Sequence, residues 1–147
     1  MTKEQIINKW LPIISDDYMH FSKEQMDYAK LISLQFSIKE YDNRGVMMWA
    51  TVKDIDSVKR TQALLFYIKP EYRGSNLFLT MVKNLERIAI EEESEEIIIG
   101  RSISGYKEQK FNKFFMWLGY TQAGFIKKVR KDGRSSIGNS DWRTSRS

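Results

Sequence analysis

The turn between an apolar run at 63–68 and a helical pattern that begins at Leu77 has residues that could bind an anion. The run has the length of a buried strand, and Pro70 ends it because proline cannot donate a ladder hydrogen bond. The first turn of a helix leaves backbone N–H groups unpaired at the positive end of the macrodipole. Gly74 allows close approach of the backbone, and Arg73 carries a guanidinium that matches phosphate. The pattern predicts either a phosphate-binding turn or an ordinary strand-to-helix joint with a surface arginine.

A resemblance to a known family starts from the same stretch. The residues I-K-P-E-Y-R-G at 68–74, followed by an amphipathic helix, resemble the signature segment of the GNAT superfamily of acetyl-CoA-dependent N-acetyltransferases. L-G-Y at 118–120 resembles the L-G-[FY] ending of that family. The run A-L-x-x-Y-x-x-P-E-Y-R-G at 63–74 is most similar to small GNAT-like proteins encoded by bacteriophages. The likeness covers about residues 45–130. It implies an α+β fold with a GNAT-like mixed, mainly antiparallel twisted sheet and helices on both faces.

The resemblance also implies that the turn binds acetyl-CoA. Family members hold the thioester and pantetheine through main-chain groups of the central strand, which correspond here to Phe66, Tyr67 and Ile68, and their glycine-rich turn lies over the pyrophosphate. The implied cofactor-binding residues are Tyr67, Ile68, Arg73, Gly74, Ser75, Asn76, Leu77 and Phe78.

Two positions depart from the family pattern. The family turn reads [QR]-x-x-G-x-[GA], and here Asn76 stands at the usual glycine and Phe78 at the usual small residue. Asparagine tolerates a left-handed backbone. Phe78 would crowd the pyrophosphate unless its ring turns toward the sheet, as its place in the apolar stripe of the helix indicates. The family often places a tyrosine general acid where this chain has Phe115, so Tyr106, Tyr67 or a water would have to replace it.

Transfer of an acetyl group to an amine requires a held donor, a neutral amine and a proton for the leaving thiolate. Glu71 and His20 are the nearest candidates for the base, although the motif places neither of them. The catalytic candidates are therefore Glu71, Tyr106 and His20.

Composition narrows the class of protein. The chain has 147 residues, no cysteine and one histidine, which favours a single domain without disulfides or a Cys/His metal site. The glutamate run at 91–96 is typical of a solvated face rather than of a metal loop. No apolar run approaches the ~20 residues that span a bilayer, and the N-terminus does not have the pattern of a signal peptide. We expect no metal, no membrane, and a soluble protein of a cytoplasm, the host's if the gene belongs to a phage.

Charge gathers at one end of the chain. Residues 127–147 hold seven Lys and Arg against two Asp, which accounts for the whole net charge of +5. We expect one GNAT-like domain over 1–131, with N-terminal helices in 1–31 and the sheet with two main helices in 32–131. The Gly/Ser/Arg tail at 132–147 would be disordered alone or held by a partner.

Local patterns predict the elements. A helix over 3–11 should be ended or interrupted by Pro12, and Ser22 with Gln25 forms a capping box for a second helix through about Lys30. Alternating apolar residues from Leu34 predict a strand. The remaining expected elements are a turn at 42–45, strands at 46–53, 63–68, 97–100 and 120–130, a loop at 54–60, and helices at 77–91 and 106–118.

Two functional classes follow. In the first, the chain transfers an acetyl group from acetyl-CoA to an unidentified amine. In the second, it is a catalytically silent GNAT-fold structural or binding protein, such as a component of a bacteriophage particle, whose basic tail contacts phage structural proteins. Nucleic acid is a further partner that the spaced arginines of the tail suggest.

Overall fold

The computed structural model describes residues 1–99 and 126–129. The predicted helix at 106–118, Tyr106 and the basic tail lie outside these residues. None of the helices in the described part is long and apolar enough to cross a membrane. The elements in chain order are α1 (Lys3–Ile14), the π-helix η1 (Ser15–Met19), α2 (Lys23–Ser33), β1 (Ser37–Tyr41), β2 (Gly45–Lys53), β3 (Lys59–Ile68), the 3-10 turn η2 (Pro70–Tyr72), α3 (Leu77–Glu91), β4 (Glu96–Ile99) and β5 (Ile126–Lys128).

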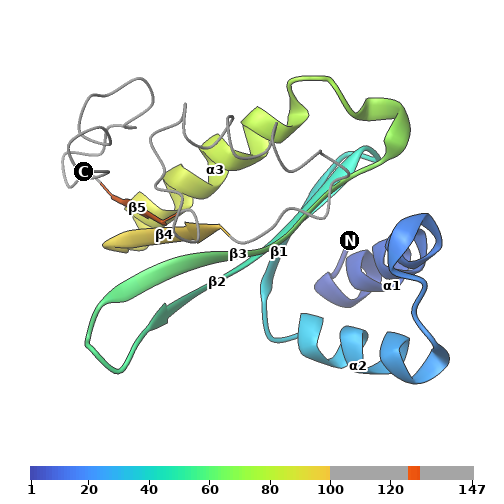
Figure 1. Cartoon of the computed structure of the whole chain (residues 1–147), viewed down its shortest axis with the longest axis horizontal. Coiled ribbons are helices and arrows are strands. Elements are labelled where there is room, and N and C mark those ends of the chain that lie inside the picture. Colours follow the sequence, from blue (N-terminus) through green and yellow to red (C-terminus); the bar gives the residue numbers. More distant parts are fainter. Residues whose placement is uncertain (100–125, 130–147) are drawn as a thin grey trace.

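The strands form one sheet in the order β1-β2-β3-β4-β5. The pairs β1–β2, β2–β3 and β4–β5 are antiparallel, and β3–β4 is parallel. Figure 1 shows the strong twist that this mainly antiparallel sheet takes along β2 and β3. The turn at 42–45 closes the first hairpin, where the Arg44 N–H donates to the Tyr41 carbonyl at 3.0 Å. The predicted α+β fold with a mixed, mainly antiparallel sheet is confirmed.

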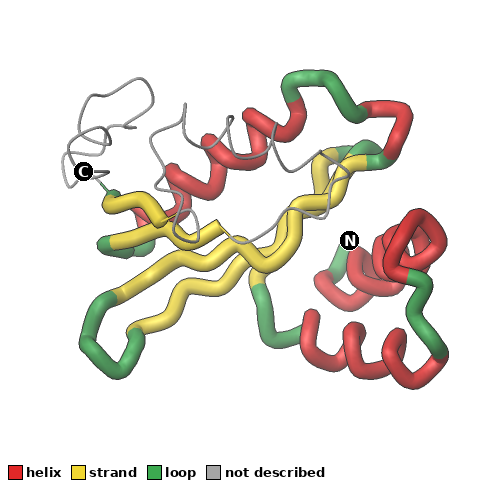
Figure 2. Tube along the Cα trace, in the orientation of Figure 1, coloured by secondary structure: helices red, strands yellow, loops and turns green. Residues whose placement is uncertain are grey.

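Helices cover both faces of the sheet (Figure 2), as predicted. Because side chains alternate along a strand, the residues of β2 and β3 contribute to two apolar clusters, one on each face of the sheet. Met47 and Phe66 join the cluster under α3, whereas Met48 and Tyr67 join the cluster beside α1. The end of β3 is therefore held from both sides.

The helix predicted at 77–91 is confirmed as α3. Its apolar stripe at helical spacing faces the sheet, and burying each large side chain of this kind contributes about 1.5–3 kcal/mol. The buried apolar residues of α3 are Leu77, Phe78, Met81, Val82, Leu85 and Ala89.

Pro12 does not end the first helix, contrary to the prediction. Helix α1 runs through Pro12 to Ile14 and continues into η1. A proline inside a helix costs about 3 kcal/mol through the lost N–H and the ring clash. The burial of Trp10 and Ile14 opposes this cost, and the Trp10 Nε1–H also donates to Glu40 of β1 at 2.6 Å. Tertiary packing therefore keeps the chain helical past the proline.

Three predicted boundaries also differ. The capping box of Ser22 and Gln25 is confirmed, but α2 extends to Ser33 rather than Lys30. Strand β1 begins at Ser37 rather than Leu34, because the N–H groups of residues 35 and 36 donate back to carbonyls of α2. Strand β3 begins at Lys59, inside the predicted loop, where cross-strand pairing with β2 and β4 extends it.

Candidate functional site

The end of β3 and the start of α3 are joined by a short, tightly hydrogen-bonded connection. The N–H of Lys69 donates to the Arg44 carbonyl at 2.9 Å, and the N–H of Arg73 donates to the Pro70 carbonyl at 3.3 Å. Gly74 follows with a φ of 89°, a left-handed conformation that favours glycine. A Cβ at Gly74 would meet nothing within 4 Å, so the backbone conformation rather than space requires glycine.

The start of α3 is open to solvent. Gly74, Ser75 and Asn76 are exposed, and the Asn76 side chain makes no capping hydrogen bond. The Ser75 hydroxyl donates to the Tyr72 carbonyl at 2.6 Å and accepts from the Leu77 N–H at 3.3 Å. No acidic residue lies in the first turn of α3. The positive end of the helix dipole is therefore not neutralised by a carboxylate of that turn.

Phe78 turns toward the sheet, as its place in the apolar stripe indicated. Its side chain is 2% exposed and belongs to the cluster under α3. The ring packs edge-on against Phe66, with centroids 5.3 Å apart. Leu77 is buried beside it. Neither of these side chains lies over the turn, where it would crowd a bound pyrophosphate.

Arg73 is bound within the protein. Its Nε–H donates to the Ile68 carbonyl at 2.9 Å, and its Nη2 donates to Asp17 Oδ2 at 2.5 Å. The guanidinium carbon also lies 5.6 Å from the centre of the Tyr67 ring. The guanidinium thus ties the turn back to β3 and to η1. Binding of phosphate by Arg73 stays a prediction.

Asp17 completes this cluster and was not identified in the sequence. It accepts a second hydrogen bond, from the Tyr67 hydroxyl at 2.9 Å. Partial burial raises the pKa of Asp17, but the hydrogen bonds from Arg73 and Tyr67 outweigh it, so the pKa is lowered below its ordinary value. Burial and the bond to Asp17 raise the pKa of Tyr67 to about 12. Because the partners are 50 and 56 positions away, no local pattern marks Asp17.

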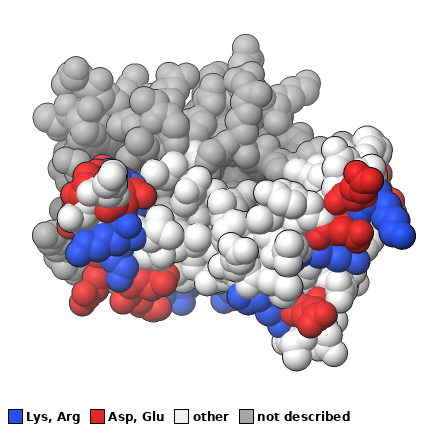
Figure 3. All heavy atoms as spheres, turned by 90° about the horizontal axis from the view of Figure 1, so that it is seen from below, with Lys and Arg blue, Asp and Glu red and all other residues white. Residues whose placement is uncertain are grey.

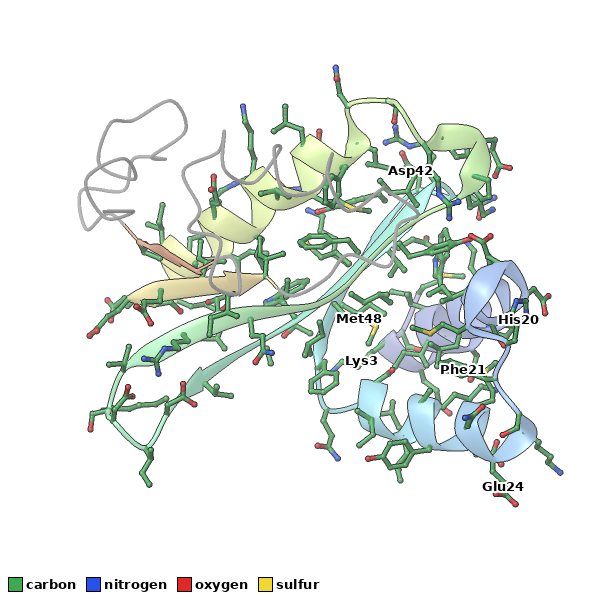
Figure 4. The ribbon with its side chains drawn as sticks, viewed as in Figure 1. Lys3, His20, Phe21, Glu24, Asp42 and Met48 are labelled. Carbon is green, nitrogen blue, oxygen red and sulfur yellow. The ribbon has the colours of Figure 1, made fainter. Side chains whose placement is uncertain are left out.

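An acidic cleft of about 390 Å³ adjoins the cluster. Asp16 and Asp17 approach it from η1, and Lys69 and Glu71 approach it from the connection after β3. Glu71 is exposed there. His20 is exposed as well but is not among the lining residues, and Figure 4 shows it at the outer edge of the N-terminal helices. Of the catalytic candidates, the cleft therefore contains Glu71.

Within residues 1–99 and 126–129, no group of three or more His, Asp or Glu side chains is placed to hold a metal ion. Within the described residues, the parallel pairing of β3 with β4 joins Arg60–Ala63 to Glu96–Ile99. On the other side of β3, Tyr67 and Ile68 pair with Val46 and Gly45 of β2.

Comparison with solved structures shows the fold. The chain is similar to the crystal structure of a ribosomal-protein-alanine N-acetyltransferase from Brucella melitensis biovar Abortus 2308, with a TM-score of 0.57 and 11% sequence identity. The similarity covers 78% of this chain and 86% of that one. No family model and no curated protein matches the sequence. The chain therefore has a GNAT-like fold, and at this identity the likeness defines the architecture alone.

Proposed function

We propose that the protein is an N-acetyltransferase that transfers the acetyl group of acetyl-CoA to an amine. The observation that supports this proposal is the open start of α3, where Gly74, Ser75 and Asn76 are exposed and Phe78 faces the core. A helix start of this kind is suited to a diphosphate. The cofactor would supply the activated acetyl group, and the backbone N–H groups of Gly74 and Asn76 would hold its diphosphate, since the Ser75 N–H donates to the Tyr72 carbonyl at 3.4 Å.

The acidic cleft supports an amine as the acceptor. Asp17 is paired with Arg73, so Asp16 and Glu71, against Lys69, leave the cleft with an excess of negative charge that would attract an ammonium group. Glu71 is the candidate base in the cleft. Tyr67 is poorly suited as the acid, because its hydroxyl already donates to Asp17 and its pKa is raised to about 12. Tyr106 or a water remains the proposed proton donor to the thiolate.

The substitution Asn76→Asp tests the cofactor site. Aspartate is a preferred N-cap residue, and its charge favours the helix start by about 0.3–1 kcal/mol, so stability should hold or rise. The same charge should repel a diphosphate and weaken acetyl-CoA binding at least ~10-fold, which corresponds to about 1.4 kcal/mol. Isothermal titration calorimetry measures the binding, and thermal unfolding measures the stability. Asn8→Asp, the same change at an exposed position of α1, is the matched control.

A wild-type protein that gives no heat with acetyl-CoA would overturn the cofactor proposal. If Asn76→Asp and Asn8→Asp weakened acetyl-CoA binding equally, the start of α3 would not be the diphosphate site. Arg73→Ala is a less clear test, because Arg73 also bonds to Ile68 and Asp17 and its loss would disturb the fold.

The engagement of Arg73 within the protein favours a second candidate function. We propose as the alternative that the chain keeps the GNAT-like fold as a catalytically silent structural or binding protein, such as a bacteriophage virion component. The basic segment 132–147 would then contact a protein partner or nucleic acid. Its tests are the absence of acetyl-CoA binding and, for nucleic acid, a salt-dependent DNA affinity that deletion of residues 133–147 removes.

A further inference from the structure

A second hollow lies on the α1 and α2 face of the sheet. It has a volume of about 670 Å³, within the range of about 300–1,000 Å³ that is typical of small-molecule sites. Its walls come from both N-terminal helices and from the two central strands. The residues that form them include Leu11 and Ile14 of α1, Ala29 and Ile32 of α2, Met48 of β2 and Leu65 of β3.

The incomplete packing of α2 leaves this cavity. Ser33 is the one buried residue of α2, whereas α1 buries Ile7, Trp10, Leu11 and Ile14. Ala29 and Ile32 line the cavity and remain partly exposed. Figure 4 shows Met48 pointing from the sheet toward the N-terminal helices. Apolar walls such as these favour an apolar occupant, because the occupant removes their surface from water.

The charged residue that lines the cavity limits which polar head group a bound molecule can carry. Among the described residues that line the cavity, Glu24 is the one charged residue, and none of them is Lys or Arg. The Gln25 amide oxygen is already used in the capping box, where it accepts from the Ser22 N–H. No hydrogen bond or ion pair joins Glu24 to another residue of the described part. Figure 3, which views the molecule from below, shows a mostly uncharged surface between its two charged ends.

We propose that this cavity binds an amphiphilic amine, with an aliphatic chain between α2 and the sheet and an ammonium group at Glu24. A carboxylate head would meet the like charge of Glu24, whereas an ammonium head would pair with it. Neighbouring residues of α1 line the two hollows, Ile14 the cavity and Ile13 the acidic cleft. Binding of the amine requires no acetyl-CoA, so it can fail or succeed independently of the proposed acetyl transfer.

The test is calorimetric titration of the full chain with straight-chain primary amines from hexylamine to decylamine, each below its micelle concentration. Affinity should rise about threefold to fourfold with each added methylene, as burial of an aliphatic chain requires. Decanoate should bind at least about tenfold more weakly than decylamine, because its head group is repelled. The absence of binding by decylamine, or equal binding of decanoate, would overturn the proposal.

Glu24→Gln tests the head-group contact, and Glu4→Gln is its control. The two glutamates occupy the same position in matching capping boxes, T-K-E-Q at 2–5 and S-K-E-Q at 22–25. Each substitution therefore removes a glutamate carboxylate from the first turn of a helix. Glu24→Gln should weaken decylamine binding about tenfold and leave decanol binding unchanged. Glu4→Gln should change neither. Equal effects of the two substitutions would show that Glu24 does not hold the head group.

Ala29→Trp tests the chain site by filling the cavity from α2. It should abolish the binding of both decylamine and decanol while circular dichroism and thermal unfolding remain those of a folded protein. Ile32→Trp is the second filling variant, used if Ala29→Trp does not fold. Undiminished decylamine binding in a folded filling variant would place the ligand elsewhere and overturn the site.

Discussion

Asp17 joins three parts of the chain at the residue scale. Its carboxylate accepts from the Tyr67 hydroxyl on β3 and from Arg73 after η2, while Arg73 also donates to the Ile68 carbonyl. The side chains of Asp17 and Arg73 are 23% and 26% exposed, so solvent screens this pair less than a surface ion pair. The position of the turn before α3 therefore depends on a residue of the N-terminal helices.

Asp17→Asn should destabilise the protein by about 1–2 kcal/mol at pH 7, because a charged acceptor of two hydrogen bonds becomes neutral. The folded-state pKa of Asp17 is lowered, so its stabilising effect is present above the unfolded-state value of about 3.8 and is lost as pH falls through the folded pKa. Urea unfolding of wild type and variant at pH 7 and near pH 3 measures the difference.

The stability difference should shrink at the lower pH, because the carboxyl of the unfolded chain takes up a proton at a higher pH than the folded-state carboxyl does. Asp27→Asn on the exposed side of α2 is the control and should change stability little at either pH. A difference that stays the same at both pH values would mean that the charge of Asp17 contributes nothing.

At the scale of elements, α3 and β3 both pack closely against Gly45 at the start of β2. A Cβ at this position would lie 2.6 Å from the Tyr67 carbonyl oxygen and 2.8 Å from Met81 Cε. The Met81 side chain could move, but the β3 backbone could not do so without separating β2 from β3. Glycine at the start of β2 thus permits both the strand pairing and the packing of α3.

Gly45→Ala should therefore destabilise the protein by about 1–3 kcal/mol, the range of overpacked cores. Gly74→Ala is the comparison, because a Cβ there contacts nothing and only the positive φ opposes it, at about 1–2 kcal/mol. Chemical denaturation measures both. If Gly45→Ala costs less than Gly74→Ala, the close contact with the Tyr67 carbonyl is not what requires glycine at 45.

The elements that sequence predicted are those whose cause is local. The apolar stripe of α3, the Ser22 capping box and the turn at 42–45 each depend on residues within a few positions, and the structure confirms all three. The inward direction of Phe78 followed from the same stripe.

Features that depend on distant contacts were not predictable from local patterns. The helix passes Pro12 because Trp10 and Ile14 pack against the sheet, and the sequence near Pro12 contains no sign of this. Asp17 was not identified in the sequence because its partners lie far along the chain, on β3 and after η2. In the candidate site, the turn was therefore predictable, whereas the bonds that hold Arg73 and the acidic cleft were not.

At the scale of the whole molecule, the two layers that cover the sheet differ in how firmly they are held. Helix α3 buries six apolar side chains against one face, and α1 buries four against the other. Helix α2 buries only Ser33, and large apolar residues such as Tyr28 (66% exposed) and Leu31 (61% exposed) face solvent. Little apolar burial opposes local opening of α2, whereas opening of α3 exposes part of the core.

Amide hydrogen exchange should consequently proceed in a defined order. Helix α2 should exchange first by local opening, α1 later, and α3 with β3 last, near the free energy of global unfolding. Mass spectrometry of the native protein, read peptide by peptide, measures this order. Saturating decylamine should slow exchange in α2 of the wild type and leave it unchanged in Ala29→Trp. Exchange of α2 as slow as that of α3 without ligand would contradict the assignment, because it would require packing of α2 that the described contacts do not supply.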